Sequence, residues 1–123
     1  MITINITNGP SLTTNWINGM NVQQALEQAY TNVPAGTFTF SLQYFGPSFG
    51  YLVLMINETY ESFNSKESPF FFWELLVNGQ IATQGIDSTI LNDGDVVTFE
   101  FIAYNSNAHH LSTTHMKYKL KQQ

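Results

Sequence analysis

The feature that most constrains this chain is a run of aromatic and branched residues from Phe70 to Val77, which ends directly at Asn78-Gly79. Aromatic and β-branched residues favour strands, and Asn-Gly is the strongest short-range signal for a tight hairpin turn. The segment therefore predicts a strand that turns at Asn78-Gly79 and returns through residues 80–83.

The aromatic strand has no ordinary solvated face. Because successive side chains of a strand point to opposite faces, Phe70 and Phe72 share one face, and Phe71 and Trp73 share the other. We expect one face to pack in the core. The other is a ligand platform, a dimer interface or a contact with a helix, and burial is the commoner fate of such aromatic stripes.

Alternating apolar residues predict further strands at residues 2–7, 37–44, 50–56 and 96–103. The run from Gly50 to Ile56 is almost continuously apolar, which predicts a strand that is covered on both sides or has a binding face. Two segments are predicted to be loops. The first starts at Asn8 and packs three residues onto the core edge, namely Trp16, Ile17 and Met20; the second, residues 57–68, is polar and mobile.

One short amphipathic helix is predicted after Asn21. Its apolar residues recur at helical spacing: Val22, Ala25, Leu26, Ala29 and Tyr30. Asn21 is a favourable N-cap, and Gln24 three positions later completes a capping box. Because so short a helix needs a sheet to cover its apolar stripe, we expect an α+β fold, with a β-grasp-like mixed sheet and this one helix packed on it.

Length and charge limit the number of domains and the partners. The 123 residues predict a single domain, with its core at about residues 2–104 and residues 105–123 as a tail or an extra strand. Lys66 is the only basic residue before Lys117, so the body of the chain is strongly acidic. This charge disfavours nucleic acid and anionic membranes as partners, and no apolar run is long enough for membrane insertion.

The chain has no cysteine, which excludes a disulfide framework and thiolate chemistry and leaves the redox compartment open. The first residues lack the basic and apolar regions of a secretory signal peptide, so none is expected. Catalytic motifs are also missing, because neither a G-x-S-x-G elbow nor a phosphate-binding glycine loop occurs. We therefore expect no enzymatic activity, although sequence leaves paired carboxylates for glycoside hydrolysis open.

Two groups of residues invite comparison with metal sites. One surrounds Gly94 and consists of Asp87, Asn92, Asp93 and Asp95. It lacks the alternating ligands and the closing glutamate of a calcium loop, so we interpret it as a turn. The other consists of His109, His110 and His115. Adjacent histidines on a strand point in opposite directions and zinc needs further ligands, which favours structural or incidental histidines.

Several segments together resemble the C-terminal β-domain of transcobalamin and intrinsic factor, which bacterial surface proteins also carry. These segments are Gly50-Tyr51-Leu52 through Ile56-Asn57, Phe72-Trp73-Glu74-Leu75-Leu76-Val77-Asn78-Gly79, Gln84-Gly85-Ile86 and Leu91-Asn92-Asp93-Gly94-Asp95. The resemblance covers roughly residues 2–104, and the expected helix lies where that family has its single helix.

The resemblance implies a corrinoid ligand such as cobalamin, held between this domain and an α-helical barrel, and an extracellular or cell-surface location. Two segments match the family's ligand contacts: Gly50, Tyr51 and Leu52, and then Trp73, Glu74 and Leu75. Glu74 stands where the family has glutamine, and this chain has no helical barrel. A site with one wall buries less of a large ligand, so weak affinity is expected.

Two functions stay open from the sequence. One is a binding domain for a cobalamin-type or other small molecule on the aromatic surface around Tyr51 and Trp73. The alternative is a protein-interaction or structural surface module, including a homo-oligomer, in which the same aromatics are buried against a protein partner or a second copy. The deciding observation is whether Tyr51 and Trp73 form an open apolar groove.

Overall fold

The structure of the chain is a computed structural model that describes residues 1–48, 50–62 and 71–103. A five-stranded sheet contains β1 (Ile2–Ile6), β2 (Ser11–Thr14), β6 (Phe71–Val77), β7 (Gln80–Ile81) and β8 (Val96–Ala103), in the order β2-β1-β8-β6-β7. A three-stranded sheet contains β3 (Phe40–Tyr44), β4 (Tyr51–Ile56) and β5 (Thr59–Tyr60), in that order. The helix is α1 (Val22–Thr31).

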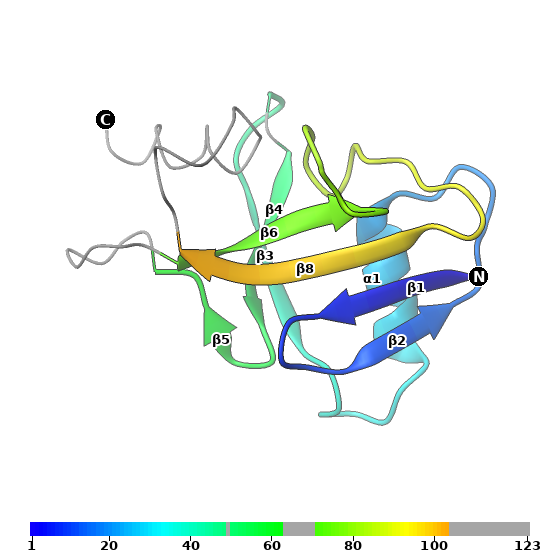
Figure 1. The fold of residues 1–123 in the computed structure, drawn as a ribbon, viewed down its shortest axis with the longest axis horizontal. Coiled ribbons are helices and arrows are strands. Elements are labelled where there is room, and N and C mark those ends of the chain that lie inside the picture. The colour runs from blue at the N-terminus through cyan, green and yellow to red at the C-terminus, as the bar shows by residue number, and fades with distance from the viewer. Residues whose placement is uncertain (49, 63–70, 104–123) are drawn as a thin grey trace.

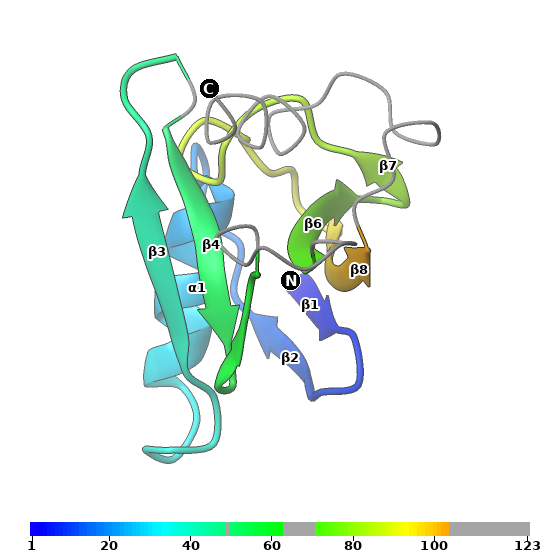
Figure 2. The same ribbon diagram turned by 90° about the vertical axis from the view of Figure 1, so that its left-hand side faces the viewer.

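The helix and the three-stranded sheet cover the same face of the five-stranded sheet (Figures 1 and 2). The larger sheet is mixed, since β1 runs parallel to β8 while its other pairs are antiparallel. The core lies between these layers, and its most buried residues include Ile4, Leu26, Val97 and Phe99. The described chain is therefore α+β and mainly β, with two sheets where the sequence predicted one.

The helix begins as predicted. Gln24 N donates to Asn21 Oδ1 at 2.8 Å, and Asn21 N donates to Gln24 Oε1 at 2.9 Å, so the capping box is complete. The four buried helix residues are Val22, Ala25, Leu26 and Ala29. Tyr30 is exposed instead and meets Phe40 edge-on, with 6.2 Å between the ring centroids. The buried stripe therefore ends one residue earlier than predicted.

Both predicted tight turns, at Asn78-Gly79 and around Gly94, are present, and a hydrogen bond joins them. Asn78 and Gly79 have φ angles of 52° and 81°, the left-handed values that a type I′ hairpin turn requires. Gly94 has a φ of 92° in the second turn. Asp95 Oδ2 accepts from Asn92 N at 2.8 Å, while Asp95 Oδ1 accepts from Asn78 Nδ2 at 2.9 Å. The two turns thus stabilise the same end of the larger sheet.

Strands occur in both segments that were predicted to be loops. β2 lies inside the first, because Leu12 and Thr14 alternate inward and Thr14 Oγ1 accepts hydrogen bonds from the helix side chains Gln28 and Asn32. β5 lies inside the second, where it pairs with the end of β4. Each of these strands forms a hairpin with the strand directly before it, and the polar composition of both segments conceals them.

The first loop packs onto the core only in part. Trp16 Nε1 donates to Leu91 O at 2.9 Å and Met20 is buried, but Ile17 is 56% exposed. The predictions for residues 63–68 and for the tail at 105–123, with His109, His110 and His115, lie outside the described residues. Within the described part of the chain, no helix has the length and apolar character needed to cross a bilayer.

Candidate functional site at the seam of the two sheets

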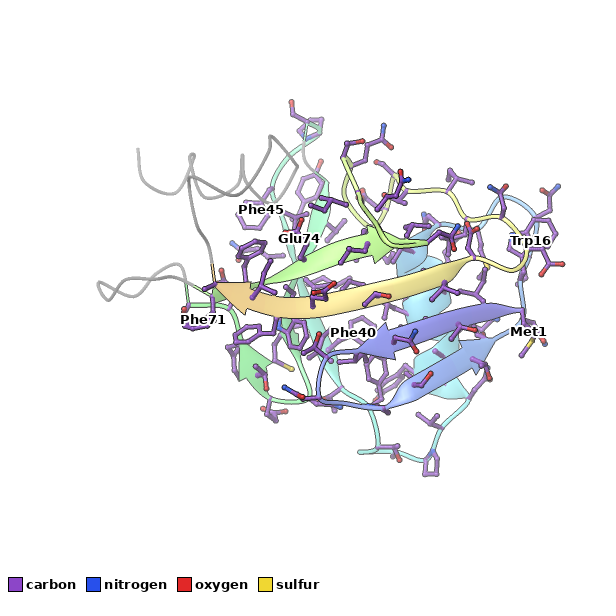
Figure 3. The ribbon with its side chains drawn as sticks, in the orientation of Figure 1. Met1, Trp16, Phe40, Phe45, Phe71 and Glu74 are labelled. Carbon is purple, nitrogen blue, oxygen red and sulfur yellow. The ribbon has the colours of Figure 1, made fainter. Side chains whose placement is uncertain are left out.

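The aromatic strand β6 is buried on both faces. Trp73 is only 6% exposed and belongs, with Leu75, to the core between the layers. Glu74 is 2% exposed and lies with Phe72 on the opposite face. Phe71 lies at the exposed start of the strand (Figure 3). Its ring stacks on Phe101 with 5.6 Å between the ring centroids. Trp73, Glu74 and Leu75 therefore cannot form one ligand surface, because they alternate between two faces.

A cavity of about 160 Å³ lies where the two sheets meet. Its aromatic floor is the pair Trp73 and Phe101, whose ring centroids are 4.9 Å apart. Two turns form the rim, one after β1 and one after β4. We call this cavity the seam pocket, and its walls include Ile6, Asn8, Ile56, Asn57, Trp73 and Phe101.

Hydrogen bonds fix the floor and one side of the rim. Trp73 Nε1 donates to Thr59 O at 2.9 Å, which orients the indole and occupies its only donor. Asn57 Oδ1 accepts from Thr39 N at 2.8 Å, while the Asn8 side chain has no hydrogen-bond partner among the described residues. An apolar floor with an amide at its rim suits a ligand that has one apolar face and a hydrogen-bonding edge.

The segment at the start of β4 has a different environment. Gly50 has a φ of 67° and its N–H donates to Gly46 O at 2.8 Å. Tyr51 N donates to Asp87 Oδ1 at 3.0 Å. A Cβ at Gly50 would lie 2.2 Å from that carboxylate oxygen, so no other residue fits without a shift. We call Gly46, Gly50, Tyr51 and Asp87 the Gly50 corner.

Tyr51 and Trp73 do not share one groove. The Tyr51 side chain is half-buried against the core, and its ring centroid lies 4.9 Å from that of the exposed Tyr44 ring. The seam pocket lies at the other end of β4, at Ile56. The six residues of β4 place Tyr51 about 17 Å from that end of the strand. Leu52 is buried between them. Of the six residues predicted to contact a ligand, only Trp73 lines the seam pocket.

The acidic turn residues bind protein groups. Asp87 holds Tyr51 N–H, Asp95 joins the two turns, and Asp93 Oδ1 accepts from the Met1 ammonium group at 2.6 Å. This agrees with the interpretation of these residues as turn formers. Within residues 1–48, 50–62 and 71–103, no three histidine, aspartate or glutamate side chains lie together so that they could hold a metal ion.

Comparison with known families gives a match to one family model, described as a domain of unknown function (DUF4430), over residues 19–103. That span is well over half of the chain and includes α1 and every strand from β3 to β8. The chain belongs to this family. The first two strands of the DUF4430 chain lie before the matched range, and no curated protein matches it in sequence.

Two solved structures share the fold of this DUF4430 chain. Haptocorrin in complex with Cbi superposes with a TM-score of 0.67 and 20% identity, over 85% of this chain and 25% of that one. A proposed metal-binding protein from Ruminococcus gnavus ATCC 29149 superposes with a TM-score of 0.55 and 14% identity, over 85% and 95%. The chain thus spans about a quarter of haptocorrin's length, and the likeness supports a transcobalamin-like fold.

Proposed function

We propose that this DUF4430 domain is a non-enzymatic binding domain that holds a small-molecule ligand in the seam pocket. The observation that carries the proposal is the open cavity of about 160 Å³ floored by Trp73 and Phe101. Its aromatic floor offers apolar contact area, and Asn8 at the rim offers a donor and an acceptor. Pockets of this character bind ligands by apolar contact and use a few polar groups for orientation.

The ligand class that we propose first is a corrinoid such as cobalamin. The support is the fold shared with haptocorrin, whose structure was solved in complex with Cbi. The seam pocket is smaller than a typical ligand site, so only a peripheral side arm of a corrinoid would enter it. A ligand of that size could also reach toward Tyr51 at the other end of β4. Because this domain by itself supplies one wall of such a site, we expect high-micromolar affinity for the domain alone.

Two further assignments belong to the same proposal. The central parallel pair of β1 and β8, with one helix on the face of the sheet, supports a β-grasp-like description. We also propose an extracellular or cell-surface location, which the resemblance to transcobalamin-type domains favours. Calorimetric titration with hydroxocobalamin tests the central claim, and we expect a saturable heat at high micromolar concentration.

Two matched variants locate the ligand. Phe101→Trp enlarges a ring that lines the seam pocket and should weaken the heat, because the larger side chain takes up part of the cavity. Phe71→Trp places the same indole on the stacked neighbour outside the pocket and should leave the heat unchanged. Binding that is unchanged in Phe101→Trp would place the ligand elsewhere.

Small ring compounds test the pocket separately from the corrinoid. If hydroxocobalamin gives no heat, but phenol or methyl glucoside binds and this binding weakens in Phe101→Trp, the pocket assignment stands and the corrinoid assignment fails. If none of the three probes binds, the seam pocket is not a ligand site.

A further inference from the structure

β3 is an edge strand, since within the described residues it pairs only with β4. Phe45 N donates to Gly50 O, and Thr39 O accepts from Asn57 N, so the backbone groups at both ends of β3 turn toward β4. In an antiparallel pair these groups alternate in direction from one residue to the next. The groups turned toward the free edge therefore belong to Phe40, Leu42 and Tyr44.

The irregularity between Ser41 and Leu42 does not disturb this alternation. Ser41 lies opposite Met55 and Leu42 lies opposite Val53, so the extra residue is in β4 and β3 itself remains regular. Figure 2 shows β3 at the margin of the molecule, with its outer edge facing away from the larger sheet. As far as the described residues are concerned, the edge is therefore open to another strand over its full length.

The β3 edge lacks the protection that edge strands normally have. Charged side chains, proline or very short length usually prevent such edges from pairing. β3 has five residues and contains neither charge nor proline, and no charged residue occurs anywhere between Glu27 and Glu58. By contrast, β5 and β7 have two residues each, and β2 follows Pro10 directly.

We propose that β3 pairs antiparallel with β3 of a second copy of this chain, which joins the two three-stranded sheets into one. A second copy is compatible with this edge because the edge carries no charge, so the repulsion between two chains of net charge −5 is weakest where this edge forms the contact. A two-fold axis at Leu42 also matches the outward groups of one edge to those of an identical edge.

The register follows from that axis. Leu42 faces Leu42 of the partner subunit, and Phe40 faces Tyr44 of the partner subunit, giving about six backbone hydrogen bonds. Ser41 then lies opposite Gln43 of the partner subunit at a pair without backbone hydrogen bonds, where cross-strand side chains are closest. This interaction goes beyond the proposed ligand function and leaves the seam pocket free, since the pocket adjoins the opposite edge of β4.

Light scattering of the full chain tests the proposal across a range of concentrations. We expect a dimer mass at high micromolar concentration that falls to the monomer mass on dilution. The double variants Ser41→Lys/Gln43→Lys and Ser41→Glu/Gln43→Glu should each be monomeric, because like charges then face each other across the axis. An equimolar mixture of the two should dimerise again, and added salt should weaken that heterodimer.

A matched control places the same charges on the other long edge. Ser11→Lys/Thr13→Lys alters two exposed residues of β2 and should leave the dimer intact. Recovery of a dimer on mixing shows that both charged variants are folded, and circular dichroism verifies this for each alone. A wild-type chain that stays monomeric at every concentration would overturn the second copy as occupant and favour an extended peptide. A dimer that persists in both charged variants would also overturn the proposal.

Discussion

The two ends of β4 use their polar groups in different ways. At the Gly50 corner, hydrogen bonds to Asp87 and Gly46 engage the backbone, and no room is left for even one added methyl group. At the other end, the same strand leads into a turn that lines the seam pocket. Asn8, on the opposite side of the rim, has an amide side chain with no hydrogen-bond partner among the described residues. The apolar strand β4 thus begins at a close-packed, hydrogen-bonded corner and ends at an open cavity.

The sequence predicted one ligand-binding surface around Tyr51 and Trp73. The structure instead has a structural corner at Tyr51 and a cavity at Trp73. Close-packed regions respond to an added methyl group with strain, whereas a region with free volume accommodates it. Substitutions at the Gly50 corner should therefore change stability, and substitutions around the seam pocket should mainly change ligand binding. Each prediction below tests this contrast.

The largest effect is expected for Gly50→Ala. The new Cβ would meet Asp87 Oδ1 at 2.2 Å, and the φ of 67° is strained for alanine. Together these should lower the free energy of unfolding by about 3 kcal/mol or more, measured by urea denaturation. Gly46→Ala is the control, because its φ of 89° is equally strained but nothing lies within 4 Å. We expect it to cost about 1 kcal/mol, and equal losses would contradict the role of the close contact.

Asp87→Ala should have the next largest effect. It leaves Tyr51 N–H without its acceptor, which costs about 1–2 kcal/mol of unfolding free energy for a part-buried donor. In the double variant with Gly50→Ala, the close contact is gone, so the additional cost of the alanine should fall to that of Gly46→Ala. Strictly additive costs in this double-mutant cycle would show that Asp87 does not set the requirement for glycine.

The parts of the fold that sequence predicts are those fixed by short-range chemistry. The Asn78-Gly79 turn and the capping box between Asn21 and Gln24 each depend on residues one to three positions apart, and both are confirmed. The apolar pattern of β4 is likewise confirmed, with both of its faces largely covered. These signals gave the correct α+β class.

The parts that sequence missed depend on contacts between distant segments. Tyr51 meets Asp87 across 36 positions, and Thr7, which lines the seam pocket, bonds to Phe99 across 92. No local pattern reveals that the turn after β1 meets the turn after β4, so Asn8 and Phe101 were not recognised as pocket residues. The ligand-contact role of all six predicted residues stays a prediction from the family resemblance: Gly50, Tyr51, Leu52, Trp73, Glu74 and Leu75.

Trp73→Phe and Trp16→Phe form a matched pair at the two ends of the molecule. Each removes one indole hydrogen bond of 2.9 Å to a backbone carbonyl, of Thr59 and Leu91 respectively. Both should lower the unfolding free energy by about 1 kcal/mol. Only Trp73→Phe alters the floor of the seam pocket, so calorimetry should show weaker hydroxocobalamin binding for that variant alone. Equal loss of binding in both would indicate a general loosening of the fold.

The smallest change in stability is expected for Asn8→Gly. Asn8 has a φ of 56°, which glycine adopts freely, and its side chain has no hydrogen-bond partner among the described residues. The unfolding free energy should therefore change by no more than about 0.5 kcal/mol, while ligand binding weakens several-fold because the rim loses an amide.

Asn57→Gly is the comparison for Asn8→Gly, because it also keeps a left-handed turn but removes the acceptor of Thr39 N–H. It should cost about 1 kcal/mol of unfolding free energy. If Asn8→Gly were equally destabilising, Asn8 would be a structural turn residue. The rim of the seam pocket would then have no amide free for a ligand at this position, and the two ends of β4 would differ only in how tightly they are packed.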